Sequence, residues 1–286
     1  MALLALPSRP IAIGPLRETP QKNMKIIIPL SGLGKRFQDA GYTDIKPLIK
    51  VNGKPIIEWV ISMFPGNHDF IFICRQEHLK STPLESELKR IKPEGKIISI
   101  EGHKLGPVYA VTQVLDLIDD DEEVITNYCD FFQVWDFEHF AKTVREKQVA
   151  GAIPCYTGFH PHLLHPENLY ASCKKDAESN LIEIREKYSF EVDKTKTSHS
   201  GGTYYFSKGK YVKKYFQQLI DEKVSLNGEY YISLVYNLMV RDGLKVLVYD
   251  DVPYFCQWGT PKDLEEYNTW MEIFKILNAD YADKIK

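Results

Sequence analysis

An uninterrupted apolar run stands near the beginning of the chain. Residues 26–30 read Ile-Ile-Ile-Pro-Leu, and Ser31 and Gly32 follow directly. A strand with one face in water alternates apolar and polar residues, whereas a strand of a parallel sheet is covered on both faces. The run therefore predicts a strand that is buried inside a parallel sheet.

Strand-like and helix-like segments alternate after this run. Residues 56–64 follow Pro55, which suits the first turn of a helix, and residues 69–74 form the next apolar run. The alternation continues with a helix at 77–91, a strand at 96–100, a helix at 108–117 and a strand at 123–126. This order predicts an α/β fold, a Rossmann-like three-layer sandwich whose mixed central sheet is mostly parallel.

The second half of the chain departs from this alternation. Strand-like runs stand at 150–155, 169–173, 181–184 and 202–206, and they predict antiparallel strands that extend the sheet. We expect one domain over 24–286, with a first half at 24–149, a second half at 150–260 and a C-terminal helix at 261–286. That helix is expected to pack on the body or on another subunit. The sequence therefore allows either a monomer or a homo-oligomer. The proline-rich residues 1–23 predict a disordered N-terminal extension.

The composition is that of an ordinary globular chain. Of the 286 residues, 44% are hydrophobic and 26% are charged, and the net charge is −3. Nucleic-acid surfaces usually carry a basic face, so we expect no nucleic-acid partner. The five cysteines form no Cys-x-x-Cys pair, and no apolar stretch is long enough for a membrane span. These features predict a cytoplasmic protein with reduced cysteines and no membrane contact.

The loop after the first strand carries two glycines and two cations. Gly32 and Gly34 lack a Cβ, so the backbone can turn with a positive φ and bring its amides against phosphate oxygens. Lys35 supplies a mobile point charge and Arg36 a planar fork for a polyphosphate. The spacing differs from a Walker loop, and Phe37 stands where a dinucleotide fingerprint has its third glycine. The loop thus predicts a phosphate site of another type, and an ordinary basic turn is the alternative.

Several ordered motifs resemble those of the nucleotide-sugar pyrophosphorylases, nucleotidyltransferases that join an NTP to a sugar 1-phosphate or a similar phosphomonoester. The loop is similar to their Gly-x-Gly-x-Arg signature, and Lys46-Pro47 followed by Gly53-Lys54-Pro55 is similar to their next block. The likeness continues to about residue 267 through Gly106-Pro107, Asn127-Tyr128-Cys129-Asp130, Glu186-Lys187, Gly201-Gly202-Thr203, Glu229-Tyr230 and Gly259-Thr260-Pro261. The resemblance implies a glycosyltransferase-A-like nucleotidyltransferase fold, with NTP bound by residues 24–149 and the acceptor by residues 150–260.

The resemblance also implies an Mg²⁺-dependent enzyme that condenses an NTP with a phosphomonoester and releases pyrophosphate, for capsule, envelope or glycan biosynthesis. The attacking phosphate is already an anion, so the protein has to position the groups and neutralise charge. In this scheme Arg36 and the loop amides hold the β- and γ-phosphates, Lys46 approaches the α-phosphate and Asp130 holds Mg²⁺. The remaining nucleotide-binding residues would be Leu30, Ser31, Gly32, Gly34, Lys35, Gly106 and Pro107.

The acceptor side of the same resemblance contains two departures from the family pattern. Its implied acceptor-binding residues are Glu186, Lys187, Gly202 and Glu229. Tyr188 replaces the proline that usually follows the lysine, and Gln257 occupies the second metal position, where its amide offers an oxygen but no charge. The set therefore also admits a catalytically inactive pyrophosphorylase-like subunit that senses nucleotide sugars or regulates an assembly.

The chemical nature of the acceptor stays open at this level. Pro29 and Leu30 before the loop favour the cytidylyltransferase branch of the family, which activates phosphocholine or another non-sugar phosphate. Aromatic residues that would surround a quaternary ammonium by cation–π attraction are Tyr128, Phe131, Phe132, Trp135, Tyr188, Tyr204, Tyr230, Tyr231 and Trp258. His160, His162 and His165 allow either a zinc site or an acceptor-binding loop.

Overall fold

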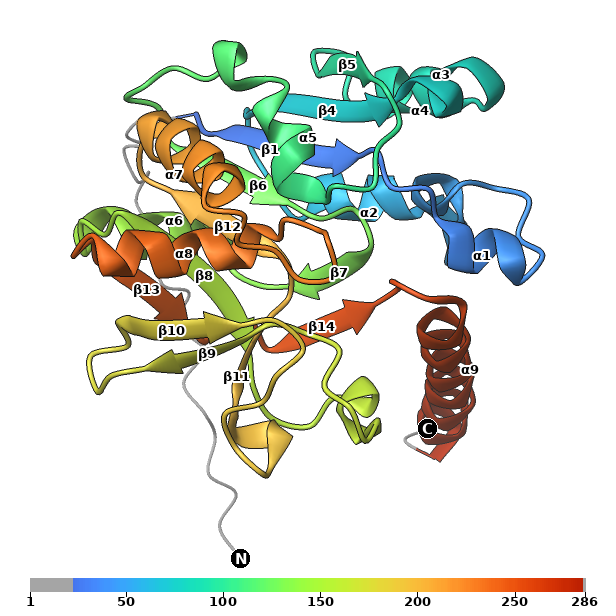
Figure 1. The fold of residues 1–286 in the computed structure, drawn as a ribbon. Coiled ribbons are helices and arrows are strands. Elements are labelled where there is room, and N and C mark those ends of the chain that lie inside the picture. Colours follow the sequence, from blue (N-terminus) through green and yellow to red (C-terminus); the bar gives the residue numbers. More distant parts are fainter. Residues whose placement is uncertain (1–22, 285–286) are drawn as a thin grey trace, which may run out of the picture.

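The computed structural model describes residues 23–284, with side chains up to residue 276. The N-terminal extension expected at 1–23 lies outside the described residues, apart from Asn23. Within the described range, ten strands form one sheet in the order β10-β9-β11-β8-β12-β6-β1-β4-β5, with β13 beside β8 (Figure 1).

The first strand lies in the middle of the parallel part of this sheet. β1 (Lys25–Leu30) pairs in parallel with β4 (Asp69–Arg75) on one side and with β6 (Val124–Asn127) on the other, and β5 (Lys96–Ile100) pairs in parallel with β4. All six residues of β1 are buried, as predicted. The carboxyl ends of these strands therefore meet at one edge of the sheet.

The remaining strands extend the sheet beyond β6. They are β12 (Thr203–Phe206), β8 (Gly151–Tyr156), β11 (Ser198–Ser200), β9 (Ser172–Lys175), β10 (Leu181–Arg185) and β13 (Val246–Tyr249). Each is antiparallel to its neighbours except β13, which is parallel to β8. These pairings give each strand its direction. β10, β11 and β12 run opposite to the other strands of the described sheet, which share one direction. The predicted mixed, mostly parallel sheet is confirmed.

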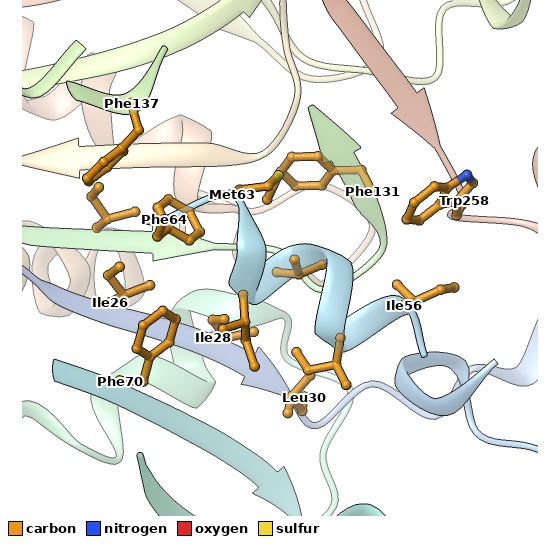
Figure 2. Packing of buried hydrophobic residues seen from close by; sticks show 14 of the residues in the cluster. Ile26, Ile28, Leu30, Ile56, Met63, Phe64, Phe70, Phe131, Phe137 and Trp258 are labelled. Atoms are coloured by element: carbon orange, nitrogen blue, oxygen red, sulfur yellow. The ribbon is translucent and has the colours of Figure 1, made fainter. Parts of the chain in front are cut away.

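Helices cover both faces of the sheet. The buried cluster on one face includes α2 (Ile56–Ser62) and α6 (Phe137–Glu146), and the cluster on the other face includes α5 (Pro107–Thr112), α7 (Gly209–Asp221) and α8 (Ile232–Arg241). The side chains of β1 alternate between the two clusters, since Ile26 and Ile28 belong to the α2 cluster (Figure 2) and Ile27 to the other. Each such burial contributes about 1.5–3 kcal/mol. The predicted three-layer sandwich is confirmed.

Short elements connect these layers near the edge where the strands end. They are α1 (Lys35–Asp39), β2 (Lys50–Val51), β3 (Lys54–Pro55), β7 (Phe131–Val134), β14 (Tyr254–Gln257) and the 3₁₀ turns Lys46–Leu48, Leu115–Leu117, Pro161–Leu164 and Lys194–Lys196. β7 and β14 form a separate antiparallel ladder in which Gln257 is opposite Phe131. That ladder brings the segment after β6 next to a segment that lies more than a hundred residues later in the sequence.

Three predicted elements differ from the structure in extent. The helix predicted at 77–91 is two helices, α3 (Gln76–Ser81) and α4 (Leu84–Ile91). Thr82 between them is extended, with φ −136° and ψ 164°, because the ring of Pro83 disfavours a helical residue before it. The helix predicted at 108–117 ends as a regular helix at Thr112, and the strand predicted at 169–173 begins only at Ser172.

The C-terminal helix, α9 (Pro261–Lys284), packs on the body through its first turns (Figure 1). Leu264 is buried, and the ring of Tyr267 meets Trp258 edge to face at 5.3 Å between centroids. Further along, Trp270 and Phe274 are exposed. In the part of the chain that the structure describes, no helix has both the length and the apolar character needed to cross a membrane.

Candidate functional site

Two adjoining cavities of about 470 Å³ each lie at the carboxyl edge of the parallel strands. Loops after β1, β5 and β6 contribute to their walls, which is where nucleotides bind in folds of this type. The cavities have seven lining residues in common: Gly34, Lys35, Lys46, Tyr128, Asp130, Glu229 and Tyr231. They are therefore two ends of one cleft, named for the roles predicted from the sequence: the nucleotide end (by Ser31 and Gly106) and the acceptor end (by Glu186 and Gly202).

Every residue to which the nucleotidyltransferase resemblance gave a catalytic, nucleotide-binding, acceptor-binding or metal-binding role lies on the wall of this cleft. Leu30, Ser31, Gly32, Gly106 and Pro107 line the nucleotide end; Arg36, Glu186, Lys187, Gly202 and Gln257 line the acceptor end; Gly34, Lys35, Lys46, Asp130 and Glu229 line both. These residues come from segments that are far apart in the sequence. The structure thus brings them together, while the role of each stays a prediction.

The glycine loop turns sharply at its second glycine. Gly34 has φ 65°, and α1 begins directly after it. Gly32 does not adopt a positive φ, so the expectation that both glycines do so holds only for Gly34. The buried ring of Phe37 anchors the helix, whereas Lys35 and Arg36 are exposed to solvent beside the cleft. The loop therefore presents both cations where a polyphosphate can reach them.

Lys46 and Asp130 meet in the middle of the cleft. The ammonium of Lys46 lies 2.6 Å from Asp130 Oδ2 and also donates to the carbonyl oxygen of Gly259 at 3.0 Å. Buried Pro47 and Leu48 hold the turn that carries Lys46. Asp130 is held by the β7–β14 ladder, since the N–H of Trp258 donates to its carbonyl oxygen at 3.0 Å. Two residues 84 positions apart are thus joined by an ion pair.

The oxygens around Asp130 suit a magnesium ion that keeps most of its ligands as water or phosphate. A Cβ placed on Gly259 would lie 3.3 Å from Asp130 Oδ2 and 2.4 Å from the Gln257 amide nitrogen, so the two side chains are neighbours. Carboxylate, amide and backbone oxygens are hard ligands of the kind that Mg²⁺ prefers. Only the carboxylate supplies charge. The donor set therefore fits a metal shared with a polyphosphate rather than one caged by the protein.

Glu186 is a half-buried residue at the acceptor end. The hydroxyl of Ser233 donates to its Oε1, and Glu186 stands directly after β10. Burial raises the pKa of Glu186 to about 7, although the Ser233 hydrogen bond and the Lys187 charge both act in the lowering direction. The residue can therefore serve as a hydrogen-bond donor or acceptor near neutral pH.

Tyrosine rings accompany the carboxylates at the acceptor end. Tyr231 donates to Glu229 Oε2 at 2.8 Å, and its own pKa is raised, first by burial and then by that hydrogen bond. Of the aromatic residues singled out in the sequence, Tyr128, Tyr204 and Tyr231 line the cleft. Phe131 and Trp258 are instead buried in the apolar core, Phe132 and Trp135 pack against it, and none of the four lines the cleft. Tyr170 lines the acceptor end and was not anticipated.

His103 and Lys104 line the nucleotide end and were also missed from the sequence. His103 Nδ1 accepts the N–H of Leu105 at 3.2 Å, and its Nε2 lies 3.4 Å from Ser31 Oγ. Burial, followed by the nearby Arg75 charge, lowers the pKa of His103. Gly106 and Pro107 of the same loop were predicted to bind the nucleotide, but no motif distinguishes this histidine from an ordinary loop residue.

The three histidines at 160–165 are not part of this cleft. His162 Nε2 lies 2.9 Å from the hydroxyl of Tyr156, and the N–H of Phe255 donates to His160 Nε2 at 3.3 Å. Burial lowers the pKa of His162 to about 3, so its imidazole is neutral. Among the described residues that line the cleft, none belongs to this cluster. Its first two histidines pack among aromatic rings outside the cleft, and an acceptor-binding role for this loop stays a prediction.

The comparison with curated proteins found a longer protein, part of which is similar to this chain. The chain is 27% identical over 272 residues to the "Bifunctional protein GlmU" of Methanocaldococcus jannaschii. The match covers 92% of the chain and 57% of that relative, so the chain spans little more than half of its length. No protein-family model matches the chain.

Solved structures share the whole architecture at low sequence identity. A nucleoside-diphosphate-sugar pyrophosphorylase from Vibrio cholerae RC9 superposes with a TM-score of 0.68 and 19% identity, over 85% of this chain and 98% of its own. The chain has the nucleotide-sugar pyrophosphorylase fold. An inositol-1-phosphate CTP transferase from T. maritima gives a TM-score of 0.63 and 15% identity, over 87% of this chain and 95% of its own. The resemblance inferred from the sequence motifs is thus confirmed for the nucleotidyltransferase fold.

Proposed function

We propose that this protein is an Mg²⁺-dependent nucleotidyltransferase that condenses an NTP with a sugar 1-phosphate or a similar phosphomonoester. The observation that carries the proposal is the meeting of the glycine loop, Lys46 and Asp130 in one cleft. The fold shared with nucleotidyltransferases supports it. We assign residues 24–149 to the NTP, residues 150–260 to the acceptor and 261–286 to a C-terminal helix.

The chemistry requires positioning more than acid–base catalysis. An anionic oxygen of the acceptor phosphate attacks the α-phosphorus, a new P–O bond forms, and the bond to the β-phosphate oxygen breaks to release pyrophosphate. Arg36 and Lys35 neutralise the charge of the β- and γ-phosphates. Lys46 approaches the α-phosphate and neutralises its charge. Bound Mg²⁺ would add positive charge beside the phosphates through Asp130 and Gln257. Lys187 and Glu186 orient the acceptor.

The acceptor end also supports a second candidate, a cytidylyltransferase that uses a phosphomonoester with a cationic group, such as phosphocholine. Tyr128, Tyr170 and Tyr231 lie there together with the carboxyl groups of Glu186 and Glu229. Rings and carboxylates attract a quaternary ammonium. One structural neighbour is, by its name, a CTP transferase on inositol 1-phosphate, so CTP and a non-hexose phosphomonoester are compatible with the fold.

An inactive, regulatory subunit is a further alternative because Gln257 supplies no charge to a second metal position. The pairing of Lys46 with Asp130 and the exposed Arg36 favour the active enzyme, since an inactive subunit has no need to retain all three. We place the active protein in the cytoplasm, with an NTP and a phosphomonoester as its small-molecule partners. A role in capsule, envelope or glycan biosynthesis follows if the acceptor is a sugar phosphate.

Pyrophosphate release tests this proposal directly. The full chain is incubated with Mg²⁺, each of five NTPs and a panel of hexose 1-phosphates and amine-bearing phosphomonoesters, with a coupled pyrophosphate assay. One NTP and acceptor pair should give turnover. If none does while the protein binds nucleotide, the regulatory alternative replaces the enzyme.

Substitutions of the two central residues should remove this activity from a folded protein. Lys46→Ala and Asp130→Ala are each expected to lower kcat about 10²–10³-fold, because each removes a charge that acts on the reacting phosphates. Lys54→Ala is the matched control, since this lysine is more than half exposed and pairs with Glu58 outside the cleft. Wild-type turnover in either cleft variant at saturating substrate would exclude that residue from the mechanism.

A further inference from the structure

Lys46 forms an ion pair with Asp130, the residue whose carboxylate the proposed function assigns to the metal. Its ammonium lies 2.6 Å from Asp130 Oδ2 and donates a second hydrogen bond to the carbonyl oxygen of Gly259 at 3.0 Å. Both side chains are mostly buried, with 19% and 28% of their surface exposed, so solvent screens this pair only in part. Without ligand, the charge of Asp130 is therefore already balanced by the protein itself.

The position of Lys46 also places it beside the phosphate loop. A Cβ on Gly34 would touch the Lys46 Cβ at 3.7 Å, and the ammonium lies 5.9 Å from the centroid of the Phe37 ring. The side chain thus passes along the glycine loop before it reaches Asp130. A lysine has a flexible four-carbon stem and three rotatable donors, so a small rotation would turn the ammonium from Asp130 toward an anion on the loop.

We infer that Lys46 is a built-in counter-ion that couples metal binding to nucleotide binding. In the free protein it holds Asp130 and excludes a divalent cation from that carboxylate. A triphosphate on the glycine loop draws the ammonium away and leaves Asp130 free for the cation that accompanies the nucleotide. This inference rests on the proposed function, and it predicts the order of events: a metal ion alone binds weakly, and metal and nucleotide bind together.

The reason is competition for the same carboxylate. An ammonium and a divalent cation repel each other at close range in a poorly screened site, so the contact of Lys46 with Asp130 weakens the binding of a metal ion there. Gln257 is uncharged, and it cannot compensate for the carboxylate that Lys46 occupies. Coupling of this kind is reciprocal, so whatever factor the nucleotide contributes to metal affinity, the metal contributes to nucleotide affinity.

Binding of Mn²⁺ without nucleotide tests the inference independently of catalysis. Free Mn²⁺ is measured by electron paramagnetic resonance in titrations of the full chain and of Lys46→Met, which keeps the apolar stem and removes the ammonium. The variant should bind Mn²⁺ about tenfold more tightly than the wild type, within the usual range of coupling between sites. Lys54→Met is the matched control and should bind like the wild type.

Two further variants separate the counter-ion role from a nonspecific change of charge. Adding Asp130→Asn to Lys46→Met should abolish the gain in Mn²⁺ affinity, and Lys46→Arg should keep the weak binding of the wild type. Thermal melts establish that each variant is folded, and Lys46→Gln replaces Lys46→Met if the latter is not. Equal Mn²⁺ affinity in the wild type and a folded neutral variant would overturn the inference.

Failure of this inference is distinguishable from failure of the proposed function. If the wild type releases pyrophosphate but loss of the Lys46 charge does not tighten Mn²⁺ binding, the enzyme stands and the counter-ion role falls. If Mn²⁺ binding tightens as expected but no NTP is turned over, the competition between Lys46 and the cation for Asp130 stands and the proposed reaction is wrong.

Discussion

The carboxyl group of Glu186 shows how burial changes the chemistry of a single residue. Burial raises its pKa from the ordinary value of 4.5 to about 7, because the charged form loses part of its hydration. The protonated form is therefore favoured in the folded state. Its contribution to stability is fully present below pH 4.5 and is lost as the pH rises through about 7.

A pH comparison with Glu186→Gln checks this sign. The free energy of unfolding of the wild type should fall between pH 5 and pH 8 by up to about 3 kcal/mol more than that of the variant, whose amide does not titrate. Urea unfolding at the two pH values provides the measurement. Other titrating groups, including His162, are common to both proteins and cancel in the comparison. An identical pH dependence would mean that the Glu186 carboxyl is charged at pH 5.

His103 is the residue at the nucleotide end whose contribution the sequence did not reveal. Its hydrogen bond to the Leu105 N–H fixes the ring beside Ser31, so the side chain faces the cavity in one orientation. We expect His103→Ala to weaken NTP binding about five- to tenfold, in line with the loss of one hydrogen-bonding group. His139→Ala, on the exposed face of α6, is the control. Calorimetric titration that shows no difference between the two variants would remove His103 from the site.

At the scale of elements, the site depends on how one loop is held against another. The N–H of Tyr230 donates to the Leu105 carbonyl at 2.9 Å, and the N–H of Val108 donates to the Tyr230 carbonyl at 3.1 Å. These two bonds join the loop between β5 and α5 to the segment before α8. Gly106 lies between them with φ 85°, where a Cβ would be 2.7 Å from the Tyr230 nitrogen.

Gly106→Ala should therefore lower the stability of the fold and weaken nucleotide binding in the cleft. Backbone atoms cannot yield as a side chain can, so we expect a loss of about 1–3 kcal/mol in the free energy of unfolding, with weaker nucleotide binding. Gly228→Ala is the matched control, because Gly228 also has a positive φ of 78° but no atom within 4 Å of its Cβ position. Denaturant unfolding gives the free energy of unfolding of both variants. The loss in Gly228→Ala measures the strain of a positive φ alone, and the extra loss in Gly106→Ala measures the contact with Tyr230. Equal losses would show that the approach of Tyr230 does not matter.

At the scale of the whole molecule, nucleotide binding should stabilise the fold because the cleft exists only when distant segments meet. A ligand at a hundred times its Kd adds about 2.7 kcal/mol, which raises the Tm by roughly 5–10 °C for a chain of this size. Thermal melts with Mg²⁺ and CTP, UTP, GTP, ATP or dTTP should single out one base. Inorganic triphosphate is the control for phosphate binding alone, and equal shifts with all nucleotides would show that the cleft does not read the base.

The core pattern and the order of the main elements were predictable from the sequence because they depend on local periodicity. The apolar run of β1, the alternation of strands and helices, and the glycine loop are all encoded within short stretches of the chain. Because carboxyl ends of parallel strands meet at one edge, the convergence of the loops followed from the same pattern. Lys46 and Asp130 were found through motifs rather than through any local signal of their contact.

The tertiary structure alone decided which of these side chains are paired, buried or exposed. The β7–β14 ladder places Gln257 beside Asp130, the body of the protein buries Glu186 and shifts its pKa, and Tyr170 reaches the cleft from a segment predicted as strand. His160 and His162 lie beside Phe255 in an aromatic cluster outside this cleft. Such contacts join residues that are distant in the chain, and periodicity carries no information about them, whereas packing in three dimensions determines both their partners and their charge.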